Sequence, residues 1–203
     1  MHTLYYAPGT CSLSPNIVLH ESGLEFKLQK VSTKTKEMEG GGDYRTINAL
    51  GYVPALKLPD GTVMTEGPVI VQYIADQVPD KNLAPANGTP ERYKLQSLLN
   101  FLSSELHKSF SPLFNPNLAD ETKAIFRAKI DDRLKWVDEQ LAGKDWLLGK
   151  QFSVADAYLF TISNWTKPMS IDLGARGNLL AFRKRMGERP SVQAAMAAEG
   201  LKN

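Results

Sequence analysis

The segment GYVPALKLPDGTVMTEGPVIVQYIADQVP, residues 51–79, contains the pattern that decides the fold of the first part of the chain. Within it, VPALKL and TVMT have the apolar residues and short length of strands, and PDG supplies turn residues between them. EGPVIVQYIADQVP then has the pattern of a helix that Pro79 ends. The segment therefore predicts a β-hairpin followed by a helix.

The residues before this hairpin alternate between strand and helix patterns. HTLYY (2–6) and EFKLQKV (25–31) predict strands, and NIVLHESG (16–23) predicts a helix. The segment 32–48, with three adjacent glycines, predicts a loose stretch with a short irregular helix. The predicted order β-α-β-α-β-β-α makes residues 1–80 a small α/β domain.

The chain after residue 87 has a helical pattern throughout. Thr89 and Pro90 are suited to the N-cap and first position of a helix that carries a stripe of leucines. A long amphipathic helix follows between Asp120 and Gly143, and Ser153 and Asp156 have the spacing of a capping box. With two shorter helices near the end, residues 87–203 are predicted to form an all-helical domain.

Composition and charge exclude several classes of function. The 24 Lys and Arg residues nearly balance the 22 Asp and Glu residues, so we expect no binding to nucleic acid or to an anionic membrane surface. We find neither a secretory signal nor an apolar run long enough to span a membrane. One Cys and three His argue against a structural metal site, and a lone Cys fits the reducing cytoplasm. We therefore expect a cytoplasmic protein without a metal.

Cys11 lies in a turn between the first predicted strand and the first helix. A lone cysteine is usually a small buried apolar residue. At a helix N-terminus, however, free N–H groups and the helix dipole stabilise a thiolate. A functional thiol is therefore a candidate interpretation beside the structural one.

Two further stretches have both a structural and a functional interpretation. Val53–Pro54 is either a trans bond at a strand boundary or a cis bond that presents the Val53 backbone to an extended peptide. In the other stretch, Thr65 and Glu66 are either capping residues or part of a ligand site. In that site Glu66 binds an ammonium group and the N–H of Gly67 binds a carboxylate.

These features in this order resemble the glutathione-binding domain of the soluble glutathione transferases, which has a thioredoxin-like fold. PGTCSLSP (8–15) and NFLSSELHKSFSPLF (100–114) are most similar to the bacterial beta class, and FSVADAY (152–158) is similar to the family's second domain. The resemblance covers the whole chain. It implies an α/β thioredoxin-like domain followed by an all-helical domain.

The resemblance also implies a set of site residues. The glutathione thiol is expected beside Cys11, its cysteinyl backbone on Val53, its γ-glutamyl end at Glu66 and Gly67, and its glycyl carboxylate at Lys36. Without the resemblance, Lys36 is better interpreted as a solvated lysine. The expected glutathione-binding residues are Cys11, Lys36, Val53, Pro54, Glu66, Gly67, Asn100, Ser104, Glu105 and His107.

Thiol activation has several candidates. Asn100, Ser104 and His107 share one face of an ideal α-helix, and the resemblance places His107 near the sulfur, as a proton acceptor or as a cation beside the thiolate. We rank Cys11 with His107 first, Ser12 next and Tyr6 last.

The expected activity is conjugation of glutathione, as co-substrate, to a small hydrophobic electrophile, as in detoxification. The expected apolar site residues are Phe110, Leu113, Phe114 and Trp165. Because residues at the Asn100 and Glu105 positions reach the neighbouring subunit's site in this class, a homodimer is implied. The alternatives are thiol–disulfide exchange or peroxide reduction through Cys11, and a non-catalytic carrier of hydrophobic ligands.

Overall fold

The computed structural model describes residues 1–201, and these fall into two compact units. The first unit is Met1–Ala84 together with the segment from Gly187 onward, and the second is Pro85–Met186. Within the described residues, no helix has both the length and the apolar character needed to cross a membrane.

The first unit contains a four-stranded mixed sheet in the order β2-β1-β3-β4. Its strands are β1 (His2–Tyr6), β2 (Phe26–Lys30), β3 (Ala55–Lys57) and β4 (Val63–Thr65). β1 is parallel to β2 and antiparallel to β3, and β3 and β4 form the hairpin predicted from the sequence. The parallel pairing requires a crossover, which is the helix α1 (Leu13–Ser22).

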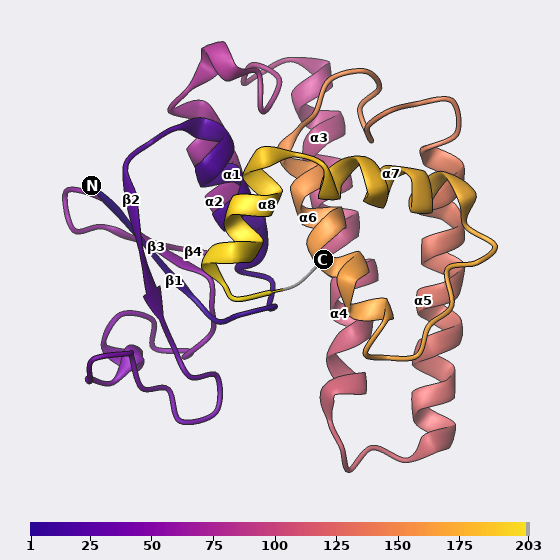
Figure 1. The fold of residues 1–203 in the computed structure, drawn as a ribbon, viewed down its shortest axis with the longest axis horizontal. Helices are drawn as coiled ribbons and strands as arrows, with labels where there is room; N and C mark the ends of the chain where they lie inside the picture. Colours follow the sequence, from indigo (N-terminus) through magenta and orange to yellow (C-terminus); the bar gives the residue numbers. More distant parts are fainter. Residues whose placement is uncertain (202–203) are drawn as a thin grey trace. The chain divides into compact units, whose positions relative to one another are not determined.

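Three helices of this unit, α1, α2 (Gly67–Asp76) and α8 (Pro190–Ala198), lie on the same side of the sheet (Figure 1). α1 packs between the other two, so seven of its residues from Leu13 to Leu19 are buried. The expected irregular helix between β2 and β3 is a single 3-10 turn, Tyr44–Thr46. Gly40, Gly41 and Gly42 all have positive φ angles (88°, 103° and 95°), a backbone conformation that a helix does not accept.

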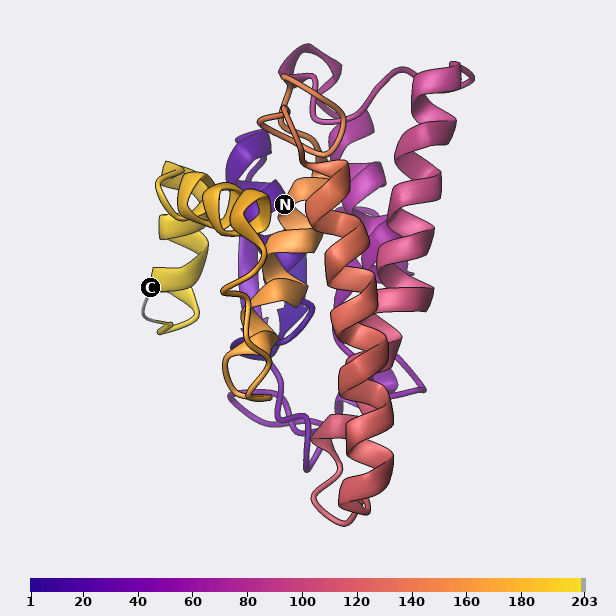
Figure 2. The same cartoon turned by 90° about the vertical axis from the view of Figure 1, so that its right-hand side faces the viewer.

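The second unit consists of helices, as the sequence predicts. They are α3 (Pro90–Phe101), a π-helical segment (Leu102–His107), α4 (Lys108–Phe110), α5 (Asp120–Gln140), α6 (Val154–Ser163) and α7 (Gly177–Gly187), with 3-10 turns at Ser111–Phe114 and Asn164–Thr166. Every residue of α6 is buried, so this helix forms the centre of the unit. α5 extends along the unit beside α3 (Figure 2). Between the two helices, the rings of Phe101 and Trp136 lie 4.3 Å apart, measured between centroids.

The position of α8 differs from the sequence expectation, which placed residues 87–203 in one domain. α8 packs on α1 and belongs to the first unit by its contacts. A predicted helical pattern specifies which face is apolar but not which partner covers it, so the sequence does not assign α8 to either unit.

Candidate active site

The loop between β1 and α1 holds Cys11 beside the segment that precedes β3. The Cys11 thiol donates a hydrogen bond to the carbonyl oxygen of Val53, with 3.3 Å between Sγ and O. The loop is closed by Ser12, whose Oγ accepts from the N–H of Ala7 at 3.1 Å and lies 2.8 Å from the hydroxyl oxygen of Thr10. The expected proximity of Cys11 to the Val53 backbone is therefore present within the first unit.

The Val53 segment is itself held by side chains from the preceding turn. Tyr44 Oη and Asn48 Nδ2 both donate to the carbonyl oxygen of Tyr52, at 2.9 and 2.8 Å. The Val53–Pro54 peptide bond is cis, as the resemblance implies. Two side-chain hydrogen bonds from the preceding turn thus fix the backbone immediately before Val53.

Lys36 lies against the same segment. A Cβ atom placed on Gly51 would lie 3.2 Å from Lys36 Cδ, and Lys36 Nζ lies 5.7 Å from the centroid of the Tyr52 ring. Its aliphatic stem therefore lies along the turn at Gly51, and its ammonium group lies over the Tyr52 ring.

Glu66 and Gly67 form the start of α2 beside Pro54. Gly67 is close to the proline ring, since a Cβ at this position would lie 3.8 Å from Pro54 Cγ. Glu66 is exposed and has φ 66° and ψ 110°, an uncommon conformation for a residue with a side chain. The first turn of a helix leaves N–H groups unpaired, so a carboxylate acceptor and amide donors stand side by side here.

The environment of Cys11 opposes ionisation. Burial, with smaller contributions from the charges of Glu66 and Glu199, raises the pKa of its thiol to about 11, although the N–H groups of Cys11 and Ser12 act to lower it. The N–H groups at the helix N-terminus act in the direction expected from the sequence, but the cost of burial exceeds their effect. Cys11 is a neutral thiol at neutral pH.

The two rival activators are both interior residues. Ser12 is fully buried, and its hydroxyl is occupied by Ala7 and Thr10 within the loop. Tyr6 is 8% exposed, and burial, with Glu199 and Glu39 nearby, raises the pKa of its phenol. The geometry gives Ser12 the role of closing the loop, and it makes Tyr6 a poor acid or base.

In the second unit, residues 102–107 form a π-helical segment, which changes the face that Asn100, Ser104 and His107 were expected to share. Asn100 and Ser104 are exposed, and Ser104 Oγ donates to the Asn100 carbonyl oxygen at 3.0 Å. His107 is partly buried, with Nδ1 at 2.7 Å from the hydroxyl oxygen of Tyr158. The wider turn separates a partly buried histidine from two exposed polar residues.

His107 is neutral at neutral pH. Burial, with a smaller effect of Lys108, lowers the pKa of its imidazole to about 4. Of the two expected roles of His107, the neutral proton acceptor therefore fits this environment better than the cation, because burial disfavours the charged form. The neutral ring remains a hydrogen-bond acceptor or donor.

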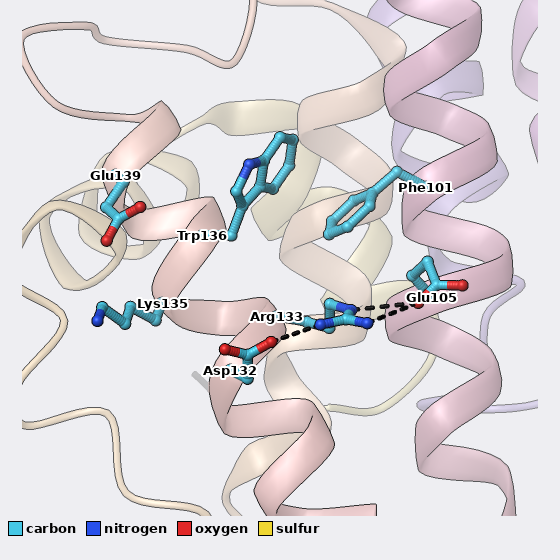
Figure 3. A pocket seen from close by; sticks show the side chains of 7 residues that line it. All are labelled: Phe101, Glu105, Asp132, Arg133, Lys135, Trp136 and Glu139. Atoms are coloured by element: carbon cyan, nitrogen blue, oxygen red, sulfur yellow. Dashed lines mark hydrogen bonds and ion pairs between the residues drawn. The ribbon is translucent and has the colours of Figure 1, made fainter.

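Glu105 points toward α5 (Figure 3). Arg133 donates to Glu105 Oε2 from both Nε and Nη2 at 3.1 Å, and Lys129 Nζ lies 3.6 Å away. The hydrogen bonds from Arg133, followed by the charge of Lys129, lower the pKa of Glu105. Its carboxylate is thus engaged within its own unit.

The expected apolar residues gather around one indole ring. Trp165 lies 4.8 Å from the His107 ring, 5.7 Å from Phe110 and 5.6 Å from Phe114, between centroids. Phe110 is fully buried and Leu113 is 8% exposed, so these two act as core residues, whereas Phe114 is 51% exposed.

Several residues of the site have no signal in the sequence. Tyr158 pairs with His107 across 51 positions, and Glu199 accepts from the N–H of Gly9 across 190. Tyr44 and Asn48 lie in the segment that the sequence describes only as loose. Each of these pairings forms only when its own unit folds. Among the described residues, no group of three His, Cys, Asp or Glu side chains is placed to hold a metal ion.

Comparison with known proteins matches both halves of the chain. The model for the glutathione S-transferase N-terminal domain matches residues 10–77, and that for the C-terminal domain matches residues 101–190. Glutathione S-transferase GstA of Escherichia coli O157:H7 is 47% identical, covering 98% of this chain and 99% of that protein. Glutathione S-transferase GST-4.5 of Xanthomonas campestris is 37% identical, covering 98% of both.

Solved structures agree. A ternary complex of BphK, a bacterial glutathione transferase, is 55% identical with a TM-score of 0.97, covering 98% of this chain and 100% of that one. The beta class enzyme of Sphingomonas chungbukensis is 47% identical with a TM-score of 0.96. A sphingomonad enzyme complexed with glutathione is 45% identical with a TM-score of 0.95. Each of these two comparisons covers 98% of this chain and 100% of the other. From its two matched domains and its near full-length relatives, the chain belongs to the glutathione S-transferase family.

Proposed function

We propose that the protein transfers the glutathionyl group, through its sulfur, to small hydrophobic electrophiles. The observation that carries the proposal is the cluster formed by Cys11, the Val53 carbonyl group, Pro54 and Gly67, which are joined by the contacts described above. A solved relative that is 45% identical is described as complexed with glutathione. Removal of foreign electrophiles is the physiological role that we propose for this activity.

The charges at the cluster fit glutathione, which carries two carboxylates and one ammonium group near neutral pH. We assign the ammonium group to the exposed carboxylate of Glu66 and the adjacent carboxylate to the N–H of Gly67. The cysteinyl backbone pairs with Val53 as a short added strand, and Lys36 binds the glycyl carboxylate.

In the reaction, the thiol of glutathione loses its proton to the neutral His107 ring, which passes it to solvent, and its sulfur attacks an electrophilic carbon. A C–S bond forms, and in a substitution the leaving group departs with its bonding electrons. Cys11 stays protonated, so that its S–H donates to the glutathione thiolate after turning from the Val53 carbonyl oxygen. His107 is proposed as a neutral proton acceptor, and Phe114 and Trp165 as apolar contacts of the second substrate.

The experiment is a glutathione-dependent rate survey over aryl halides, epoxides, peroxides and mixed disulfides. Turnover of aryl halides or epoxides supports conjugation. Turnover of only the peroxides or disulfides assigns the protein to thiol–disulfide exchange or peroxide reduction, and binding of apolar dyes without turnover assigns it to a carrier. The last two outcomes contradict the proposal.

The assignment of Glu66 is tested with Glu66→Gln and with glutathione that lacks the γ-glutamyl amino group. Loss of this ion pair is expected to raise the KM for glutathione about tenfold, because a charge-assisted hydrogen bond contributes roughly 1–3 kcal/mol. The same variant should bind the deaminated analogue as the wild type does. An equal loss for both ligands contradicts the assignment. Glu25→Gln, an exposed acid in the same unit, is the control.

We also propose that the protein is a cytoplasmic homodimer. The lone cysteine supports the reducing compartment, and the partly exposed Trp136 beside Phe101 supports an apolar contact between subunits.

A further inference from the structure

α8 lies antiparallel on α1 and contacts it at both ends. At the start of α8, Arg189 Nε donates to Glu21 Oε1 at 2.7 Å, and Ser191 Oγ donates to the same oxygen. At the other end, Asn16 Nδ2 donates to Glu199 Oε1 at 3.0 Å. The last helix of the chain is therefore fixed along the helix that begins after Cys11.

Glu199 is a buried carboxylate without a charged partner in the described part of the chain. Glu199 is 5% exposed. Its Oε1 accepts a hydrogen bond from the Asn16 side-chain amide, and its Oε2 accepts one from the N–H of Gly9 at 2.9 Å. Within residues 1–201, no lysine or arginine forms an ion pair with it. Burial raises the pKa of this carboxyl, and the hydrogen bonds from Asn16 and from the N–H of Gly9 lower it, so these bonds are what stabilise its charged form.

Gly9 belongs to the loop that carries Cys11. It has φ 71°, and its N–H donates to Glu199 Oε2. Ser12 Oγ accepts from the N–H of Ala7 within the loop, whereas Glu199, at the end of α8, accepts from the N–H of Gly9. The two sets of hydrogen bonds together determine where Cys11 lies relative to Val53.

We propose that Glu199 is a positioning residue that fixes the Cys11 loop through the N–H of Gly9, and that its buried negative charge adds to the effect of burial in disfavouring the Cys11 thiolate. A neutral Cys11 cannot compete with glutathione as the nucleophile. It also reacts slowly with disulfides, because the thiolate is the reactive form. Glu199 thus favours conjugation over disulfide exchange. This consequence rests on the proposed function, whereas the effect on the thiol does not.

The charged groups around the thiol support this direction. Besides burial, Glu66 and Glu199 raise the pKa of Cys11, and the N–H groups at the start of α1 oppose them. Glu199 also raises the pKa of Tyr6, together with Glu39. Of the two acids that act on Cys11, Glu66 is exposed and therefore screened by solvent, whereas Glu199 is buried.

The test is the pH dependence of Cys11 alkylation by iodoacetamide, which requires no glutathione. Glu199→Gln removes the charge and keeps the size of the side chain. Asn16 Oδ1 lacks a hydrogen-bond partner in the described residues, so after the Asn16 amide turns over it can accept from the side-chain amide of the glutamine. The midpoint of the profile is expected to move to lower pH, and alkylation at pH 8 to become about three- to tenfold faster. Glu25→Gln should leave the profile unchanged.

Hydrogen exchange tests the positioning role separately. Glu199→Asp keeps the charge but shortens the side chain, so amides of residues 7–12 should exchange faster while the alkylation midpoint stays near the wild-type value. This variant also serves if Glu199→Gln does not fold. An unchanged or higher midpoint in Glu199→Gln, or unchanged exchange of the loop in Glu199→Asp, overturns the proposal. A shifted midpoint in a protein without transferase activity would refute only the proposed function.

Discussion

Cys11 lies in the loop between β1 and α1, just before the start of the helix. A helix N-terminus lowers a thiol pKa, yet burial and two acids raise that of Cys11 from 9.0 to about 11. Two pKa units correspond to about 3 kcal/mol. The lone cysteine is therefore better suited to donate a hydrogen bond than to attack a substrate.

Cys11→Ala is expected to retain measurable conjugation, because the proposed contribution of Cys11 is one weak hydrogen bond to the glutathione thiolate. Steady-state rates with the best electrophile of the survey provide the measurement. Loss of all activity in a variant with an unchanged melting temperature would instead give Cys11 a central catalytic role.

The same residue should form a mixed disulfide with oxidised glutathione, releasing one molecule of glutathione. Because the thiolate attacks, the rate should increase about tenfold per pH unit between pH 7 and 9. Intact-mass spectra should show one added glutathionyl group on the wild type, removed by reductant, and none on Cys11→Ala. A rate independent of pH would contradict the raised pKa.

His107 predicts a second pH dependence. Its folded pKa of about 4 lies below its ordinary value of 6.5. The unfolded chain therefore binds more protons than the folded one between these values, and stability falls as the pH decreases from 6.5 to 4. In His107→Asn this loss should be smaller, as measured by urea unfolding at both pH values. The remaining slope includes His20, whose pKa burial also lowers. A slope as steep as that of the wild type would show that His107 is not held neutral.

At the scale of elements, α6 depends on its N-terminal residues. Asp156 is fully buried and accepts from the N–H of Ser153 and of Leu147, both at 2.8 Å, and from Ser153 Oγ at 2.9 Å. The capping box predicted from Ser153 and Asp156 is present, and the bond to Leu147 adds a connection to the preceding loop.

Asp156→Ala should lower the free energy of unfolding by about 2–4 kcal/mol, since it removes a capping residue and leaves buried N–H groups unpaired. Urea unfolding measures the loss. Asp120→Ala, which changes an exposed acid in the first turn of α5, is the matched control and should cost less than about 1 kcal/mol. Loss of turnover without loss of stability in Asp156→Ala would contradict this structural role.

At the scale of the whole molecule, the proposed homodimer can be tested at Trp136. This side chain is 37% exposed and faces Phe101 beside the Glu105–Arg133 ion pair (Figure 3). Sedimentation equilibrium should give twice the chain mass of 22.5 kDa, and Trp136→Glu should weaken association, because a charge would be buried. Ile125→Glu, at another exposed apolar residue of α5, is the control. A monomeric wild type would contradict the proposal.

The sequence by itself determined the elements that depend on local chemistry. Turn residues specify the β3–β4 hairpin, and Thr89, whose side chain accepts from the N–H of Arg92, marks the start of α3. The same holds for the capping box of Ser153 and for the family resemblance, which the comparisons confirmed. Each of these signals extends over a few neighbouring residues, so it is readable before the chain folds.

The tertiary structure alone decided the properties that depend on burial and on distant partners. It lowered the pKa of His107, raised that of Cys11, and occupied the hydroxyl of Ser12 inside the loop. It also packed α8 on α1 and brought Glu199 to Gly9 across 190 positions. Desolvation and contacts across long sequence separations arise only when the core closes, because no local pattern specifies which groups will be enclosed together.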